Sequence, residues 1–189
     1  PLWDGGQTDE GRIQIARGNA SGLTIVHQTL EPDFTGEQRG SSVACAGDVN
    51  GDGYADVLSG SPLHSSGGEV DLFLGMSTGI SAVPTSLSGF QATARFGRSV
   101  ASAGDFNGDG FSDVIVGAQF HDGTLTNEGR VRCYPGAAAS ISNTADRVLP
   151  GPVGSLAYGR TVASAGDVNG DGYSDVIIGA PGGNRAYVH

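Results

Sequence analysis

The chain contains no lysine, so all ten of its basic residues are arginine. Against 20 acidic residues this gives a formal net charge of −10, and no basic stripe runs along the sequence. Such a balance argues against nucleic acid as a partner. No segment approaches the roughly 18 consecutive apolar residues of a membrane-spanning helix, so we predict no membrane span. The absence of lysine favours a GC-rich bacterial genome as the source.

Cysteine is also scarce. The chain has two, Cys45 and Cys133, at positions where related stretches of the sequence carry Ser102 and Leu72. Both lie in strand-like segments, where a cysteine behaves as a small apolar residue. We predict two buried free thiols and no disulfide, because a bridge would have to join different repeats of the sequence.

The usual signatures of catalysis are missing. There is no Gly-x-Ser-x-Gly elbow, no His-Glu-x-x-His and no phosphate-binding glycine loop. The four histidines, His27, His64, His121 and His189, are scattered without the spacing of metal ligands. We therefore predict that the chain is not an enzyme.

What the chain has in abundance is glycine, with 33 residues, many of them in an acidic loop that occurs three times. The leading aspartates of the loops are 57 and 62 residues apart, and the matching text extends well beyond them. A recurring spacing of this size is typical of repeat folds, in which one unit packs on the next. The loops are GDVNGDGYAD (47–56), GDFNGDGFSD (104–113) and GDVNGDGYSD (166–175).

The segments around each loop are typical of short strands. They are rich in Val and Ile, bounded by Gly, Asp, Asn and Pro, and without apolar residues at helical spacing. About four antiparallel strands per unit describe a β-propeller blade, whereas a β-solenoid has much shorter coils. We predict an all-β fold of about three four-stranded blades. The predicted units are 1–36 (second half of a blade), 37–93 (a blade), 94–155 (a blade) and 156–189 (first part of a blade).

Each loop carries the hard oxygen donors that calcium prefers, whereas Mg²⁺ keeps its waters and seldom uses an all-protein cage. Positions 1, 3 and 5 supply Asp, Asn and Asp side chains, position 7 a backbone carbonyl and position 9 a closing carboxylate. The aromatic residue at position 7 is expected to pack its ring under its own loop. Position 12 is not Glu and the flanks are strands, which excludes an EF-hand. Dockerin loops, which are similar, lead into helices.

Nine of the 20 acidic residues lie in these three loops. Crowding carboxylates in this way is costly unless a cation lies among them. We predict three bound calcium ions. The predicted ligands are Asp48, Asn50, Asp52, Tyr54 and Asp56; Asp105, Asn107, Asp109, Phe111 and Asp113; and Asp167, Asn169, Asp171, Tyr173 and Asp175.

The repeat resembles the FG-GAP repeat, the unit of the integrin α-subunit β-propeller and of many bacterial surface and secreted proteins. The resemblance implies about seven four-stranded blades around an axis, with calcium in the loop between the first two strands of a blade. The first unit departs from the motif at both ends, which predicts weaker packing of that blade. The motif pairs are Phe96-Gly97 with Gly117-Ala118-Gln119, Tyr158-Gly159 with Gly179-Ala180-Pro181, and the divergent Arg39-Gly40 with Gly60-Ser61-Pro62.

The resemblance also implies that ligands approach the face opposite the calcium loops. We expect a calcium-stabilised module for adhesion or ligand binding, secreted or on the cell surface, with a protein or a carbohydrate as ligand. The alternative is the non-catalytic propeller portion of a secreted hydrolase or lyase. The face would be built from loops 2–10, 31–38, 63–67, 120–128 and 150–156, in which Trp3, His64 and His121 hold equivalent positions.

The sequence begins and ends inside a repeat unit. Three units leave two open sides, each an apolar surface that favours association. We predict that the chain is an excerpt of a longer propeller. The alternative is head-to-tail self-association, in which copies of the chain join through heterologous contacts into a ring.

Overall fold

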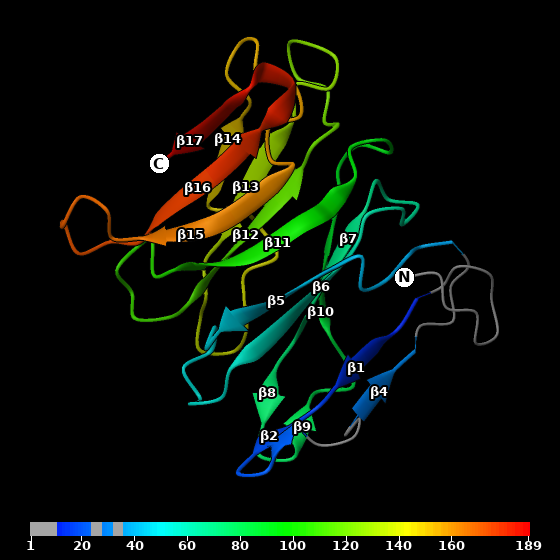
Figure 1. Ribbon diagram of the computed structural model, residues 1–189, viewed down its shortest axis with the longest axis vertical. Coiled ribbons are helices and arrows are strands. Elements are labelled where there is room, and N and C mark those ends of the chain that lie inside the picture. The colour runs from blue at the N-terminus through cyan, green and yellow to red at the C-terminus, as the bar shows by residue number, and fades with distance from the viewer. Residues whose placement is uncertain (1–10, 24–27, 32–35) are drawn as a thin grey trace.

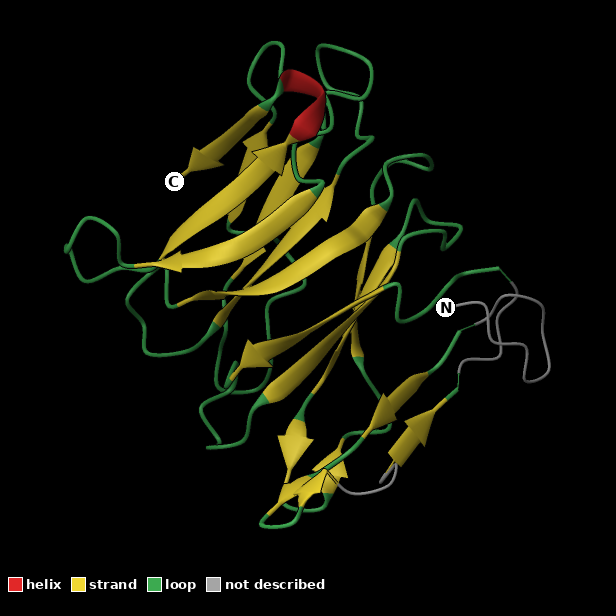
Figure 2. Cartoon of the chain, viewed as in Figure 1, coloured by secondary structure: helices red, strands yellow, loops and turns green. Residues whose placement is uncertain are grey.

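The structure, a computed structural model, describes residues 11–23, 28–31 and 36–189 (Figure 1). Within this part of the chain every regular element is a β-strand except one short 3-10 turn, η1 (Pro181–Gly183) (Figure 2). None of its helices is long and apolar enough to cross a membrane. The predicted all-β fold with antiparallel sheets is confirmed. The predicted ligand loop 2–10, with Trp3, and residues 32–35 lie outside the described residues.

Three sheets follow one another along the chain with the same antiparallel topology (Figure 1). The first sheet contains β5 (Ser42–Gly47), β6 (Asp56–Ser61), β7 (Glu69–Phe73) and β10 (Thr85–Ser88), paired in that order. The second contains β11 (Phe96–Gly104), β12 (Asp113–Ala118), β13 (Arg130–Tyr134) and β14 (Arg147–Pro150). The third contains β15 (Thr161–Gly166), β16 (Asp175–Ala180) and β17 (Arg185–Val188).

Three shorter pairs complete the described strands. One is β1 (Ile13–Ile15) with β4 (Gln28–Leu30), whose register, Ile13 opposite Leu30, matches that of Val70 opposite Leu87 in the first sheet. The other two are small hairpins, β2 (Gly18–Asn19) with β3 (Gly22–Leu23) and β8 (Gly75–Met76) with β9 (Gly79–Ile80).

The hydrophobic core lies between neighbouring sheets. Side chains alternate along a strand, so Val114 of β12 joins the cluster between the first and second sheets, and Ile115 joins the cluster between the second and third. Both side chains are fully buried. A strand that is covered on both faces typically has a continuous run of apolar residues, and residues 114–116 of β12 form such a run.

The outer faces of the first and third sheets are partly uncovered. Val43 of β5 stands at the repeat position of Val100, and Ile177 of β16 at that of Ile115. Val100 and Ile115 are 7% and 0% exposed, whereas Val43 and Ile177 are 59% and 39% exposed. Apolar surface that an adjacent sheet covers in the middle of the chain is therefore open at both ends of the series.

The glycines of the Phe-Gly and Gly-Ala pairs lie where two sheets touch. A Cβ atom on Gly117, in β12, would overlap the carbonyl oxygen of Gly159, which precedes β15. Gly60 has the same relation to Gly97 between the first and second sheets. Because only glycine allows two backbones to come this close, the motif marks a contact between units.

The first unit replaces the aromatic residue of the motif with Arg39. Its Nη1 lies 2.7 Å from Oδ2 of Asp71; the side chain of Asp71 is buried and that of Arg39 is half-buried. Oδ1 of Asp71 also accepts a hydrogen bond from Ser86 Oγ. The divergent motif is thus accompanied by an ion pair whose carboxylate is buried, and removing one partner of a buried pair typically costs about 3–5 kcal/mol.

Both cysteines are free, as predicted, but only one is buried. Burial raises the pKa of Cys133 to about 12, so this thiol stays protonated and unreactive. Cys45 is exposed, and the prediction of a buried residue was wrong. Its Sγ accepts the N–H of Gly47 at 3.4 Å, as Ser102 Oγ accepts the N–H of Gly104. A β-bulge removes that N–H from the ladder, so the position needs an acceptor on the open side of the strand.

Candidate metal centres

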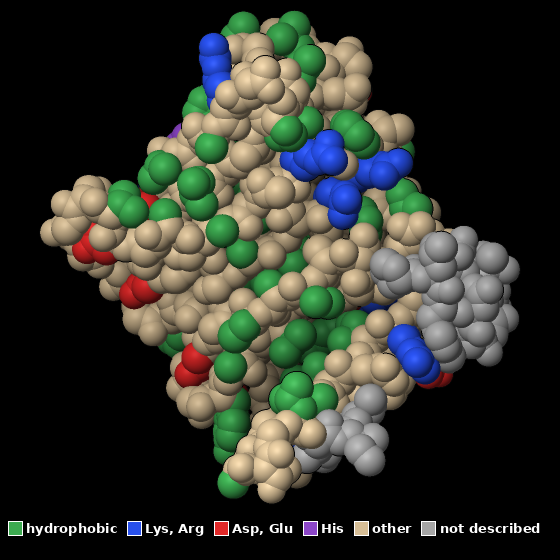
Figure 3. All heavy atoms as spheres, in the orientation of Figure 1, with side chains coloured by type: hydrophobic (Ala, Val, Ile, Leu, Met, Phe, Trp, Pro, Cys, Tyr) green, Lys and Arg blue, Asp and Glu red, His purple; other side chains and the backbone are tan. Residues whose placement is uncertain are grey.

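The three acidic loops emerge at the same edge of the molecule. They connect β5 to β6, β11 to β12 and β15 to β16, and β11 lies between β5 and β15 (Figure 1). The glycine that begins each loop has a positive φ of 83°, 71° or 68° (Gly47, Gly104 and Gly166), a conformation that glycine adopts without strain. Figure 3 shows exposed carboxylates along this edge.

The aspartate at position 1 folds each loop around its carboxylate. Asp48 Oδ1 accepts the N–H groups of Gly51 at 2.7 Å and Asp52 at 3.1 Å, and its Oδ2 accepts that of Gly53 at 2.8 Å. Asp105 and Asp167 make the same three contacts in their loops. Backbone hydrogen bonds hold the pKa of Asp48 and of Asp167 below the ordinary value of 3.8.

The side chains at positions 3 and 5 form hydrogen bonds with one another and with the backbone of the loop. Asn50 Nδ2 donates to Asp52 Oδ2 at 3.0 Å, and Asp52 Oδ1 accepts the N–H of Tyr54 at 2.9 Å. These residues are exposed or half-buried at the tip of the loop. The other loops repeat the arrangement with Asn107, Asp109 and Phe111, and with Asn169, Asp171 and Tyr173.

The aspartate at position 9 is buried and joins the loop to the rest of its sheet. Asp113 is fully buried, and its two oxygens accept the N–H groups of Phe106 and Gly136, each at 2.8 Å. Gly136 follows the third strand, so this carboxylate ties the loop to β13. Asp56 does the same in the first sheet, and Asp175 is half-buried and accepts from Val168.

The aromatic residue at position 7 packs on a neighbouring loop, and the expectation that its ring lies under its own loop was wrong. A Cβ on Gly51 would lie 2.9 Å from Cε1 of Phe111, and one on Gly108 would lie 2.7 Å from Cε1 of Tyr173. Each ring therefore covers a glycine of the preceding loop. The N–H of Ser112 also donates to the carbonyl of Asp48 at 3.0 Å. Adjacent loops are linked to one another.

The donors of each loop fit calcium by their chemistry, since all are hard oxygens. None of the nine loop aspartates forms an ion pair with a basic side chain in the described part of the chain. No group of three His, Cys, Asp or Glu side chains stands in metal-binding geometry among the described residues. Oδ1 of the position-1 aspartate accepts two backbone N–H groups, whereas its Oδ2 and the oxygens of the position-9 aspartate accept at most one each and keep a further lone pair. Binding would require the loop side chains to turn toward a common centre.

In calcium-free buffer, we expect the free energy of unfolding to rise as the pH falls from about 6 to 3.8. Burial raises the pKa of Asp113 to about 6 from 3.8, so the folded chain binds this proton more tightly than the unfolded chain does. In excess calcium we expect the opposite slope, because protons compete with the metal for the carboxylate. Thermal unfolding across this window measures both slopes.

The matched variant for this experiment is Asp113→Asn, which cannot ionise. In calcium-free buffer, this variant should show a smaller rise in the free energy of unfolding as the pH falls. The part of the rise that comes from Asp56, whose pKa burial also raises, should remain. Parallel slopes with and without calcium would contradict a shared role of Asp113 in proton and calcium binding.

On the predicted ligand face, the two histidines at equivalent positions lie in different surroundings. His64 Nε2 lies 3.2 Å from Glu37 Oε1 and 3.9 Å from Glu69 Oε2. Burial raises the pKa of both carboxyl groups. Burial lowers the pKa of His121, and the arginines of β13, Arg130 among them, lower it further. Sequence equivalence therefore does not produce equivalent sites.

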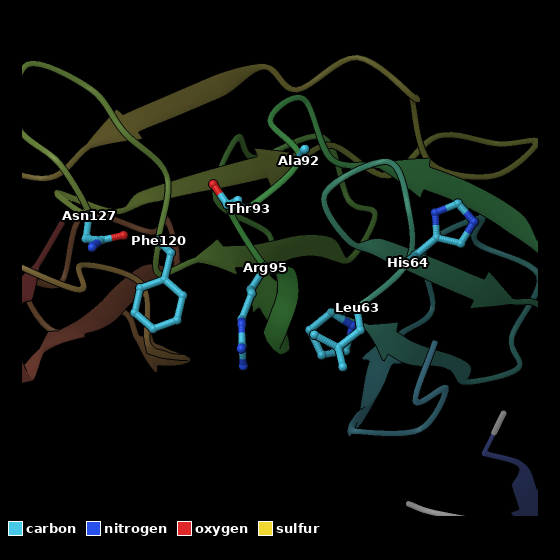
Figure 4. Close-up of a pocket in the computed structure, with 8 residues that line it drawn as sticks. Leu63, His64, Ala92, Thr93, Arg95, Phe120 and Asn127 are labelled. Atoms are coloured by element: carbon cyan, nitrogen blue, oxygen red, sulfur yellow. The ribbon is translucent and has the colours of Figure 1, made fainter. Parts of the chain in front are cut away.

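The loops predicted to build this face include Leu63, Phe120 and Asn127, which line a pocket of about 390 Å³ (Figure 4). Arg95 lines the same pocket but lies outside the predicted loops. The guanidinium carbon of Arg95 lies 5.4 Å from the centroid of the Phe120 ring. One signal was available in the sequence, because only this unit has an arginine directly before its Phe-Gly pair.

Comparison with known proteins gives both a family and relatives. The FG-GAP repeat model matches residues 40–73, 96–132 and 158–189. Integrin alpha-4 of Xenopus laevis is 35% identical over 185 residues, which cover 92% of this chain and 17% of that protein. Integrin alpha-V of Gallus gallus is 35% identical over 174 residues, covering 83% and 16%. Integrin alpha-PS5 of Drosophila melanogaster is 32% identical over 165 residues, covering 82% and 16%.

The chain spans about a sixth of the length of these relatives. All three come from animals, so they give no support to the expected bacterial origin. Each of the three matched segments contains one acidic loop, and together the segments cover more than half of the chain. The chain belongs to the FG-GAP repeat family.

Proposed function

We propose that this chain is a calcium-stabilised segment of an extracellular β-propeller that serves adhesion or ligand binding. The observation that supports it is the threefold repetition of one loop: the same donors and the same backbone contacts recur at one edge of three adjacent sheets. The similarity to integrin alpha subunits supports the adhesion role. Extracellular calcium modules bind at about 10⁻⁴–10⁻³ M, which suits a calcium-rich medium.

The metal would stabilise each blade through the residues of its loop. Bound calcium would offset the negative charge of the three carboxylates in each loop. The position-1 aspartate keeps the loop wrapped, and the position-9 aspartate ties it to the end of the third strand, as Asp113 does through Gly136. The position-7 ring then carries this order to the preceding loop, as Tyr173 does at Gly108. The proposed role of calcium is structural.

The proposed partners follow from the two open faces and from the face opposite the calcium loops. Val43 and Ile177 are exposed, and neighbouring blades would cover these apolar side chains. We propose that the neighbouring blades belong to a longer propeller. Head-to-tail contact between copies is the alternative source. The face opposite the loops is proposed to bind the ligand, and we propose a binding module without catalytic activity.

We expect Asp109→Ala to lower the number of bound calcium ions from three to two. Asp109 is exposed at the tip of its loop, where its side chain accepts hydrogen bonds from Asn107 Nδ2 and from the N–H of Phe111. Its loss removes one charged ligand with little damage to packing, because Asp113 and the strands keep their contacts. Isothermal titration of calcium into the 189-residue chain measures the stoichiometry.

The matched control is Asp146→Ala, which removes an exposed aspartate outside the loops, one that lies 3.4 Å from Arg147 Nε. This variant should still bind three ions. Binding of three ions by Asp109→Ala would show that its loop does not hold a calcium ion through that carboxylate. Loss of all three sites would show that the loops do not act as separate sites.

A further inference from the structure

Arginine side chains gather at the end of the molecule that lies opposite the acidic loops. β11 and β15 run side by side, and each starts beside a Gly-Arg pair and ends at a Gly-Asp pair. Arg98 and Arg160 hold the same repeat position, and Arg95 lies just before β11. Figure 3 shows basic side chains clustered where these two strands begin, and carboxylates at the far edge.

These three arginines have no carboxylate partner in the described part of the chain. The arginine ion pairs found there are Arg39 with Asp71 and Arg147 with Asp146. Arg95 and Arg160 are exposed, and Arg98 is half-buried. A local excess of positive charge in a chain of net charge −10 creates a field that favours an anionic partner. We call the surface formed by Arg95, Arg98 and Arg160 the arginine face.

The pocket beside the arginine face combines charge with apolar walls. Arg95 extends between Phe120 and Leu63, and the three side chains point in the same direction (Figure 4). The centroid of the Phe120 ring lies 5.4 Å from the guanidinium carbon of Arg95. This distance allows a cation–π contact that restrains the orientation of the guanidinium group. A restrained guanidinium binds a carboxylate with two parallel hydrogen bonds.

The acidic side chains of the neighbouring loop do not compete for Arg95. Asp122 Oδ1 accepts the N–H of Asn127 at 2.8 Å, and Glu128 Oε2 accepts that of Thr124 at 2.8 Å. Both carboxylates are therefore turned into the backbone of their own loop. His64, on the other side of the pocket, points away from Arg95 toward its own acidic neighbours (Figure 4). The charge that faces the pocket is positive.

We infer that the arginine face and the adjoining pocket bind a segment of a partner protein that carries a carboxylate side chain next to an apolar one. The carboxylate would meet Arg95, and Arg98 and Arg160 would attract further acidic residues. The apolar side chain would lie between Phe120 and Leu63. A sulfated glycan could pair its sulfate groups with the three arginines, but it has no apolar group to fill the pocket. This inference rests on the proposed ligand-binding function and names its ligand class.

The first test is selection from a library of random short peptides displayed on phage, with the 189-residue chain immobilised in calcium. We expect the selected peptides to be enriched in Asp and Glu beside Leu or Phe. One selected peptide, labelled for fluorescence anisotropy, and its copy with Gln and Asn in place of Glu and Asp then measure affinity. Neutral copies should bind at least tenfold more weakly, and added salt should weaken the acidic peptide.

The variant that tests the site combines Arg95→Gln, Arg98→Gln and Arg160→Gln. It should bind the acidic peptide about tenfold more weakly, since surface charge pairs contribute modestly one by one. The matched control is Arg147→Gln, an exposed arginine at the start of β14, near the acidic loops. The control should bind like the unchanged chain. Unfolding temperatures in calcium show whether each variant is folded.

Selection of basic peptides, absence of any enrichment, or equal weakening by Arg147→Gln would overturn the inference. Binding of heparin without enrichment of acidic peptides would also overturn it and assign the face to a glycan. The results distinguish failure of the proposed calcium role from failure of the arginine face. A chain that binds three calcium ions but selects no acidic peptide retains the calcium role, whereas one that selects acidic peptides without binding calcium retains the arginine face.

Discussion

Gly117→Ala is expected to separate the second and third sheets and to lower the free energy of unfolding by about 3 kcal/mol, at the upper end of the cost of overpacking. The added Cβ would overlap the carbonyl oxygen of Gly159, which belongs to backbone and cannot rotate away. The cluster around Ile115 and Val162 lies between the same two sheets and would lose contacts. For a chain of this size the melting temperature should fall by about 6–12 °C.

The matched control is Gly179→Ala, at the same motif position in the third unit. There the nearest atom to the added Cβ is Oγ1 of Thr161, a side-chain atom that a rotation moves away. No further sheet follows β16 and β17 in the described chain. We expect this variant to cost less than about 1 kcal/mol. Equal melting temperatures of the two variants would contradict the direct contact between motif glycines.

Much of this architecture is predictable from the sequence because it depends on local chemistry. The short Val- and Ile-rich runs around each acidic loop predict paired strands, and the recurring spacing predicts repeated sheets. The wrapping of the loop is local as well. Asp48 reaches the N–H groups of Gly51 and Gly53 within a few residues of itself, so a single loop contains all the information for that contact.

The features that the sequence did not predict depend on how distant segments of the chain pack together. The ring of Tyr173 lies on Gly108 of the preceding loop, a contact that exists only once two sheets are side by side. The ion pair of Arg39 with Asp71 joins residues 32 positions apart. Cys45 is exposed because it lies on the same face of β5 as Val43, a face that is partly uncovered at the end of the series of sheets. Neither the ion pair nor the uncovered side of β5 is visible in composition or periodicity.

Withdrawal of calcium is expected to have the largest effect on this chain. Metal that binds only the folded state stabilises it by mass action, by about 2.7 kcal/mol for each site at a free concentration one hundred times the dissociation constant. Three separate sites would together contribute about 8 kcal/mol. Without the metal, the three carboxylates of a loop repel one another, and no ion pair with a basic side chain offsets this within the described residues.

The effect should be graded by concentration, because the linkage depends on the logarithm of free calcium above the dissociation constant. Magnesium at the same concentration should stabilise the chain much less, since it dehydrates reluctantly and demands a stricter geometry. Asp109→Ala should retain roughly two thirds of the calcium effect if the sites are independent. A larger loss would indicate coupling through contacts such as that of Tyr173 with Gly108.

Calcium binding by the three acidic loops is tested by differential scanning calorimetry of the 189-residue chain, first in excess calcium and then in excess chelator at the same neutral pH. We expect chelation to lower the melting temperature by about 15–30 °C and re-addition of calcium to restore it. An unchanged melting curve in chelator would contradict the assignment of the three acidic loops as calcium sites.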